Sequence, residues 1–209
     1  MKILIFFIIL VLFIIYQNLE KNIFNFRDIN ILHNDPDFII IYNVLDYKIF
    51  RSLQKIVNNL YNLDKNRSVL HYYNLDNDLL KNILYDDVLI DKIKELLNVD
   101  NIQILDDEQK KYSYILRFID DKSNELVWHK DTTSTKNKKL YVMLLILENK
   151  GFKNNLSHQQ NCRNIDNVVD CIDTPPNSLL IYEGGNILHR TTKIYKNEHR
   201  IVLQSSFLV

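Results

Sequence analysis

Hydrophobic residues recur with a helical period in the first half of the chain. Two helices are predicted there, one after Asp46, which stands at an N-cap position, and one over residues 88–97. The apolar residues at helical spacing in the first helix are Ile49, Leu53, Ile56, Val57 and Leu60. A run of β-branched and aromatic residues over 38–42 precedes this helix and predicts a short strand.

The second half of the chain changes to runs of branched and aromatic residues that are typical of strands. These runs cover residues 112–119, 140–147, 178–182 and 200–209. Because polar segments rather than helices separate them, they favour an antiparallel sandwich or barrel over a sheet of βαβ units. The polar stretch 149–176 is predicted to be one long loop, long enough to serve as a lid over a site.

An apolar run over residues 3–16 stands at the start of the chain. Extended over 1–19, it nearly reaches the roughly 20 residues that a membrane-spanning helix needs. Since no small-residue cleavage pattern follows, we expect an uncleaved signal anchor, with a cleaved signal peptide and a buried element as alternatives. The polar stretch 20–36 is expected to be a linker and 37–209 the folded domain.

Charge and cysteine content limit the classes of function. The chain has 26 basic and 26 acidic residues, so it offers no broad positive surface for nucleic acid. Cys162 and Cys171 lie close together, and the tripeptides 66–68 and 155–157 match the N-glycosylation pattern. A lumenal domain with a local disulfide would explain both features. Free thiols and chance tripeptides in a chain rich in Asn explain them equally, so both interpretations stay open.

The candidate chemistry centres on His129 and Asp131. Residues two apart on a strand project to the same face, so both side chains can reach one metal ion. With His189 they supply two imidazoles and a carboxylate, a set that occupies one face of octahedral iron(II) and leaves other positions open. The same pattern recurs at His33 and Asp35, but that pair lies in the predicted linker and is given no role. Position between two predicted strands distinguishes the first pair.

In their order along the chain, these motifs resemble those of the iron(II)- and 2-oxoglutarate-dependent dioxygenases, especially the prolyl 4-hydroxylase-like branch. The matching stretches are 115–118, 128–131, 142–147, 176–182, 188–189 and 200–203. The resemblance covers roughly residues 37–209. It implies an α+β fold with a double-stranded β-helix, or jelly-roll, core on which helices from the N-terminal half pack.

The resemblance also implies roles for four residues. His129, Asp131 and His189 would bind Fe(II), and Arg200 would bind the distal carboxylate of 2-oxoglutarate, to which a guanidinium presents two parallel donors. The implied reaction hydroxylates a protein side chain, prolyl or lysyl, with release of succinate and carbon dioxide, and it leaves room for ascorbate as a further cofactor. The expected substrate is thus a protein or peptide.

The location expected from the N-terminal run is a membrane that the chain crosses once. The folded domain would then lie in the lumen of the endoplasmic reticulum or at a viral or host membrane. The few charges that flank the run do not indicate its orientation.

Departures from the family pattern bear on the substrate more than on the metal. Arg200 follows His189 by eleven residues, one more than the commonest spacing. Leu126 stands where the branch often has a tyrosine, and the glycine pair expected after the third strand is reduced to Gly151, while a pair occurs elsewhere, at Gly184. These differences leave the substrate class open.

Two other functions are consistent with the same fold. A non-catalytic jelly-roll module at a membrane or virion would bind without turnover, but a complete set of metal ligands argues against it. A nucleic-acid demethylase would need a second arginine after Arg200, and Arg200 is the last basic residue of the chain.

Arg200 could also pair with Glu198 or Asp173 at the surface.

The remaining histidines and the neighbours of the motif are interpreted as ordinary positions. Trp128, the one tryptophan, is expected to pack near the site rather than to take part in chemistry. The residues without a matching context, interpreted as ordinary polar positions, are His71, His158, His199 and Arg190.

Overall fold

The computed structural model describes most of the expected domain. The described residues are 23–24, 26, 30–35, 38–63, 69–71, 78–104, 115–120, 127–131, 138–150, 160–196 and 198–209. The expected anchor and both candidate glycosylation tripeptides lie outside these ranges. None of the helices within them is long and apolar enough to cross a membrane.

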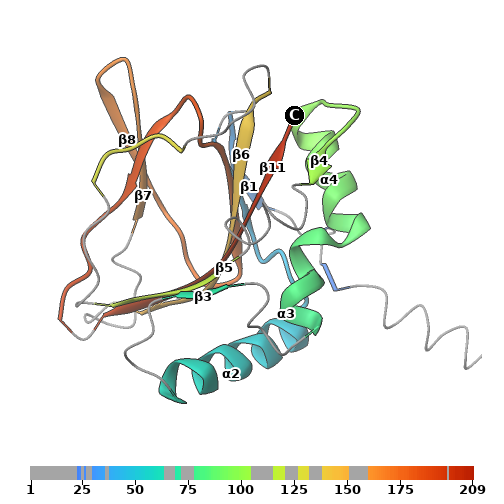
Figure 1. Ribbon diagram of the computed structural model, residues 1–209, viewed down its shortest axis with the longest axis vertical. Coiled ribbons are helices and arrows are strands. Elements are labelled where there is room, and N and C mark those ends of the chain that lie inside the picture. Colours follow the sequence, from blue (N-terminus) through green and yellow to red (C-terminus); the bar gives the residue numbers. More distant parts are fainter. Residues whose placement is uncertain are drawn as a thin grey trace, which may run out of the picture.

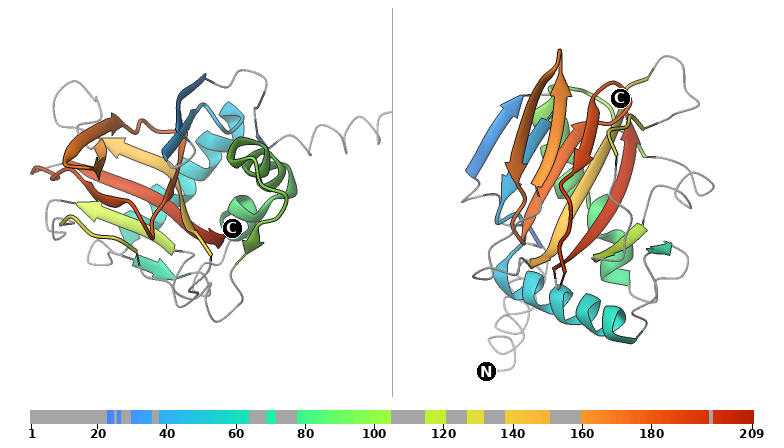
Figure 2. Two further views of the ribbon diagram at one scale, coloured as in Figure 1. Left: turned by 90° about the horizontal axis from the view of Figure 1, so that it is seen from above. Right: turned by 90° about the vertical axis from the view of Figure 1, so that its left-hand side faces the viewer.

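Two antiparallel sheets form the core of the described chain (Figure 1). The eight-stranded sheet contains, in spatial order, β1 (Asn30–Asp35), β2 (Phe38–Tyr42), β9 (Ser178–Glu183), β6 (Leu140–Lys150), β11 (His199–Leu208), β5 (Ile115–Asp120) and β3 (Val69–His71), with β4 (Gln103–Ile104) paired to β11. The three-stranded sheet has the order β10 (Leu188–Thr191), β7 (Gln160–Ile165) and β8 (Val168–Asp173). Helices lie on one side of the larger sheet, and the β7–β8 hairpin lies on the other (Figures 1 and 2).

The larger sheet is buried on both faces. Alternate residues of a strand pack into two different hydrophobic clusters, one against the helices and one against the smaller sheet. In β6, Met143 and Leu145 face the helices, whereas Val142 and Leu144 face the smaller sheet. This period of two follows from strand geometry, and it explains why the sequence of β6 is a continuous apolar run. The face toward the smaller sheet is the one on which polar side chains gather around a cleft.

The helices begin and pack where the apolar spacing predicts. In α2 (Tyr47–Leu63), the Asp46 carboxylate accepts a hydrogen bond from the Lys48 amide at 2.9 Å, which caps the first turn. Leu53 is fully buried against the sheet, and Gln54 donates to the Leu147 carbonyl at 2.9 Å. The other helical segments are α3 (Asp78–Asn82), the 3-10 turn η2 (Ile83–Tyr85) and α4 (Asp87–Leu97). The expected α+β arrangement, with a jelly-roll-like pair of sheets, is therefore present.

Two segments differ from the sequence prediction. Strand β1 occupies part of the expected linker, so the sheet begins earlier in the chain than residue 37, and His33 lies in a strand. The long loop predicted over 149–176 contains the hairpin β7–β8. Its turn residues Asp166 and Asn167 both have positive φ, as a two-residue type I′ turn requires. The alternation in this hairpin is weak because many of its residues are polar, which is why the pattern indicated a loop.

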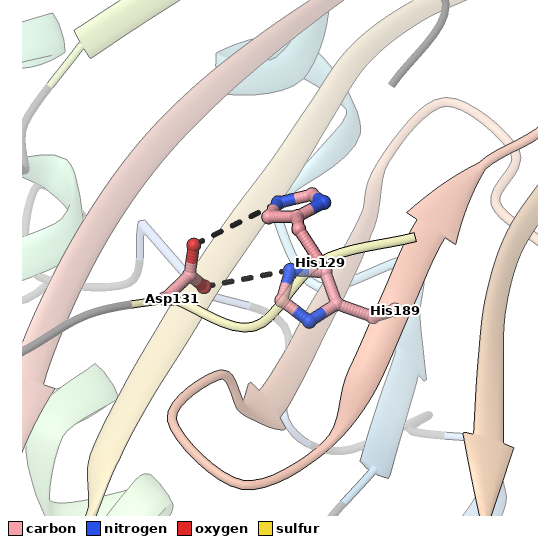
Figure 3. Close-up of side chains that lie close together, drawn as sticks. All are labelled: His129, Asp131 and His189. Atoms are coloured by element: carbon pink, nitrogen blue, oxygen red, sulfur yellow. Dashed lines mark ion pairs between the residues drawn. The ribbon is translucent and has the colours of Figure 1, made fainter. Parts of the chain in front are cut away.

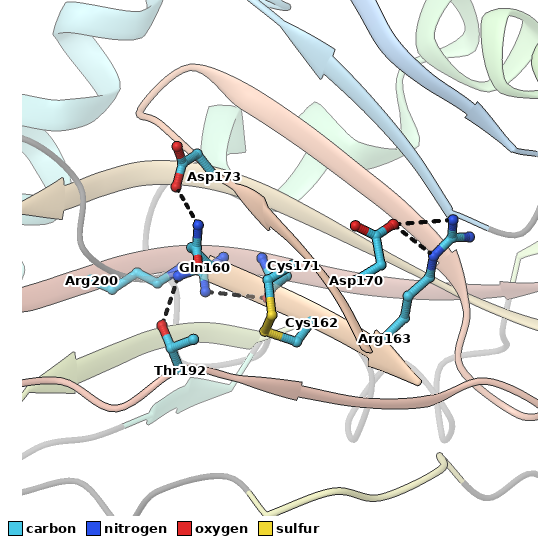
Figure 4. Close-up of a disulfide and its surroundings, with 9 residues drawn as sticks. Gln160, Cys162, Arg163, Asp170, Cys171, Asp173, Thr192 and Arg200 are labelled. Atoms are coloured by element: carbon cyan, nitrogen blue, oxygen red, sulfur yellow. Dashed lines mark hydrogen bonds and ion pairs between the residues drawn. A yellow bond between two sulfur atoms is a disulfide. The ribbon is translucent and has the colours of Figure 1, made fainter. Parts of the chain in front are cut away.

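A disulfide joins the two strands of the hairpin (Figure 4). Cys162 and Cys171 are directly opposite each other in the β7–β8 register, with their Cα atoms 4.0 Å apart, and Cys162 is fully buried. The pairing left open by the sequence is thus formed. The crosslink also fixes Asn161, the neighbour of Cys162 in β7, which contacts Arg200 in the cleft.

We expect the double variant Cys162→Ser/Cys171→Ser to lower the free energy of unfolding by about 2–3 kcal/mol, because the disulfide closes a short loop in the unfolded chain. Urea denaturation followed by circular dichroism measures the change. As a control, dithiothreitol should shift the midpoint of the wild type and leave that of the variant where it is. Equal stability of the oxidised wild type and the variant would contradict a stabilising role.

Candidate metal centre

A backbone bridge between two distant segments builds the centre. The His129 amide donates to the His189 carbonyl at 3.1 Å, and the His189 amide donates to the His129 carbonyl at 2.9 Å. Two residues further on, the Asp131 amide donates to the Gly184 carbonyl at 2.8 Å. The segment 127–131 is therefore fastened to β10 and to the turn after β9, and it projects His129 and Asp131 toward His189.

The three predicted ligands converge on one point (Figure 3). One ligand atom from each residue lies within 4.8 Å of the other two. The Nε2 atoms of His129 and His189 lie 3.8 and 3.5 Å from the carboxylate oxygens of Asp131. Spacings of this size allow all three side chains to bind the same ion.

Hydrogen bonds to the backbone fix the orientation of both imidazoles. The Nδ1 atom of His129 lies 2.8 Å from the Val127 carbonyl, and that of His189 lies 2.9 Å from the Ile187 carbonyl. A carbonyl only accepts, so Nδ1 carries the proton and Nε2 presents a lone pair to the centre. Burial lowers the pKa of His189 below its ordinary value, which favours the neutral ring that a metal needs.

The Asp131 carboxylate fits a bound cation. Its Oδ2 atom is buried and has no hydrogen-bond partner in the described residues. An unpaired carboxylate oxygen is costly to bury unless a cation completes its environment. It lies against Gly184, where a Cβ atom would overlap with Oδ2 and approach Val142 to 3.0 Å. The absent side chain of Gly184 therefore leaves the room that this carboxylate occupies.

A cleft of about 500 Å³, counted to its open mouth, extends from the three ligands between the two sheets. Besides the ligands, it is lined by polar side chains from several strands, among them Arg117, Asn161, Tyr182, Arg190 and Arg200.

Arg200 is the most deeply buried charged group in this cleft. Its side chain is 1% exposed, and its Nη1 atom donates to Asn161 Oδ1 at 3.3 Å. Its Nε and Nη2 atoms have no hydrogen-bond partner within the part of the chain that the structure describes. Burial lowers the pKa of Arg200 to about 10, so the guanidinium stays charged at neutral pH. No ion pair of the described residues joins Arg200 to Asp173 or Glu198. Asp173 accepts from Gln160, and Glu198 accepts from the Tyr195 amide.

Tyr182 interacts both with the metal ligands and with Arg200. Its ring centroid lies 4.6 Å from that of His189, and both Asp131 and Arg200 act on its hydroxyl electrostatically. Burial first and Asp131 second raise the pKa of Tyr182 far above its ordinary value. The hydroxyl therefore keeps its proton and can donate to an anion in the cleft.

The structure brings together all four residues that the sequence singled out and adds others that it did not. Arg190 was interpreted as an ordinary polar position, but it lines the cleft, and its guanidinium lies 4.6 Å from the centroid of the Trp128 ring. Arg117 and Tyr182 could have been found from strand alternation, because each lies in a predicted strand on the face opposite the helix-side core. No sequence pattern indicates a role for Gly184, because this role depends on the Asp131 carboxylate, which packs against it only in the folded chain.

Comparisons with known proteins give the fold. No model of a protein family matches the sequence, and no curated protein matches it. Among solved structures, a prolyl 4-hydroxylase from Phytophthora capsici superposes with a TM-score of 0.60 at 15% identity, over 84% of this chain and 59% of that one. The chain thus spans less than two thirds of the length of the Phytophthora protein.

Other solved structures match this chain with similar TM-scores. A prolyl hydroxylase from Trichoplax adhaerens, in complex with a hypoxia inducible factor peptide fragment, gives a TM-score of 0.59 at 16% identity, over 84% of each chain. HygX from Streptomyces hygroscopicus, with nickel and 2-oxoglutarate bound, gives 0.58 at 11% identity, over 82% of each chain. The chain has the fold of the prolyl hydroxylases and other 2-oxoglutarate-dependent oxygenases.

Replacing Gly184 by alanine should weaken metal binding by about ten- to a hundred-fold, because the added Cβ atom displaces the Asp131 carboxylate. Isothermal titration of Mn(II) into the apo protein measures the affinity. Gly185→Ala is the matched control, since a Cβ atom there finds its nearest neighbour, Leu140 Cβ, at 3.6 Å. Equal affinity of the two variants would argue against this packing role.

Proposed function

We propose that the protein is an iron(II)- and 2-oxoglutarate-dependent dioxygenase that hydroxylates a side chain of a protein or peptide. The observation that carries the proposal is the joint presence, in one cleft, of three converging metal ligands and a buried arginine that has no carboxylate partner among the described residues. A structural module would gain nothing from burying an unpaired guanidinium, which costs free energy until an anion binds.

The residues of the cleft suit the two components of such a centre. His129, Asp131 and His189 would hold Fe(II) through two neutral imidazoles and one carboxylate. Arg200 would hold the distal carboxylate of 2-oxoglutarate, with Asn161 keeping the guanidinium in place and the Tyr182 hydroxyl donating a further hydrogen bond. When bound, the metal and its cosubstrate supply the chemistry in which 2-oxoglutarate, oxygen and a C–H bond become succinate, carbon dioxide and a C–OH bond.

The proposed substrate is a prolyl or lysyl side chain in a protein or peptide. The support is the likeness to solved prolyl hydroxylases, one of which is bound to a peptide fragment. The side chains of His129 and Asp131 line the cleft and are 35% and 27% exposed, so a group of an extended chain can reach them from outside.

We further propose that the domain is anchored to a membrane and faces an oxidising compartment, such as the lumen of the endoplasmic reticulum or a viral or host membrane. The support is the apolar run over residues 3–16 together with the disulfide of the β7–β8 hairpin.

The full chain, purified in mild detergent with Fe(II), 2-oxoglutarate and ascorbate, should release succinate with pools of prolyl or lysyl peptides. His129→Ala and Asp131→Ala should abolish the release, because each removes a metal ligand. Arg200→Gln should raise the 2-oxoglutarate concentration for half-maximal rate by about ten- to a hundred-fold, because charged hydrogen bonds are lost.

The control variant for this assay is Asp100→Ala, which removes an exposed carboxylate in the turn after α4. It should release succinate at the wild-type rate. If the wild type and the ligand variants give the same background, the protein is not this enzyme, and the non-catalytic jelly-roll module becomes the better account.

The membrane proposal predicts that the expressed full chain stays in the membrane pellet after alkaline carbonate extraction, and that a chain lacking residues 1–19 does not. Thiol labelling before and after reduction should show Cys162 and Cys171 protected only in the oxidised protein. Release of the full chain by carbonate would oppose the anchor. Free thiols in the isolated protein would oppose the oxidising compartment.

A further inference from the structure

A second arginine of the cleft, Arg117, has no counterion among the described residues. It lies in β5, where Arg117 and Ile119 line the cleft and Leu116 and Phe118 face the helix-side core. Its Nε atom is buried and finds no hydrogen-bond partner in the described part of the chain. Other cations of the described chain do have carboxylate partners, as Arg163 has in Asp170.

Arg117 lies on the metal side of Arg200. The register pairs Arg200 with Ile119 and Val202 with Arg117, so the two arginines leave adjacent strands at different levels of the cleft. Burial lowers the pKa of Arg117, and Tyr182 and Asp131 raise it, whereas Tyr182 raises the pKa of Arg200. Arg117 therefore faces the region around the metal, where a substrate group must approach.

The charges of the proposed centre balance without Arg117. The two positive charges of the metal and the one of Arg200 would neutralise the carboxylate of Asp131 and the two carboxylates of 2-oxoglutarate. Arg117 and Arg190 then remain as cations that line the same cleft. The Arg190 guanidinium is stabilised by the Trp128 ring, yet its Nε atom is also buried without a partner. Partly buried cations that share a cleft favour the binding of an anion beside them.

We infer that Arg117, assisted by Arg190, forms a subsite for a carboxylate of the substrate, so that the hydroxylated residue is presented next to an acidic group. This inference rests on the proposed function and specifies its substrate class. The carboxylate can belong to an Asp or Glu side chain of a peptide or to a free amino acid, and a guanidinium would bind either in the same two-pronged way.

The test measures binding rather than turnover. Protein loaded with Mn(II) and 2-oxoglutarate is immobilised and exposed to two peptide pools with a fixed central Pro or Lys, one with Asp and Glu at the flanking positions and one with Asn and Gln. A third arm offers free proline and free lysine. The variants are Arg117→Gln, Arg117→Lys and the control Arg51→Gln, which removes the same charge from an exposed position of α2.

The wild type should retain the acidic pool, or the free amino acids, at least about ten-fold better than the amide pool. Arg117→Gln should abolish this preference, whereas Arg117→Lys should keep part of it and Arg51→Gln all of it. Retention of the acidic pool identifies a peptide substrate, and retention of free amino acids alone identifies a small-molecule acid.

Three results would overturn the subsite. They are equal retention of all probes by the wild type, an acid preference that survives in Arg117→Gln, and a loss of 2-oxoglutarate binding in Arg117→Gln, which would assign the residue to the cosubstrate. Titration of 2-oxoglutarate into each Mn(II)-loaded protein checks the last point. If the wild type itself fails to bind 2-oxoglutarate, the proposed function fails, and that outcome is distinct from a failure of the subsite.

Discussion

The two hydrogen bonds between the backbones of His129 and His189 are the interaction on which the rest of the site depends. They join a short segment between two strands of the larger sheet to an edge strand of the smaller sheet, and they set the two imidazoles side by side. Together with the hydrogen bond from the Asp131 amide to the Gly184 carbonyl, this bridge positions segment 127–131 relative to β10. With it, Asp131 reaches Gly184, and both Nε2 atoms point to the place where the Asp131 carboxylate lies.

The same cleft holds charges that the folded chain does not neutralise. Asp131 Oδ2 and nitrogen atoms of Arg117, Arg190 and Arg200 are buried without hydrogen-bond partners, although elsewhere in the described chain Lys139 and Arg163 pair with carboxylates. Such groups destabilise the empty protein, and ligands of opposite charge recover that free energy on binding. The pattern of unpaired groups thus indicates, atom by atom, where a cation and where carboxylates would bind.

Much of this arrangement could be predicted from the sequence because strands and helices leave periodic patterns. Spacing and a family resemblance together predict helix α2 with its Asp46 cap and strands β2, β6, β9 and β11. They also single out the site residues His129, Asp131, His189 and Arg200. The hairpin β7–β8 did not, because its stability comes from the Cys162–Cys171 crosslink and a type I′ turn rather than from apolar alternation. Gly184 acts through the Asp131 carboxylate, which lies far away in the sequence, so only the folded structure reveals its role.

The central claim is that His129, Asp131 and His189 bind one metal ion beside a dicarboxylate held by Arg200. Anomalous diffraction at the manganese edge, from a crystal grown with Mn(II) and 2-oxoglutarate, tests it most directly. The account predicts one manganese peak within bonding distance of both Nε2 atoms and an Asp131 oxygen, with a carboxylate of 2-oxoglutarate on Arg200. A cleft without manganese, or manganese bound away from these three residues, would contradict the account.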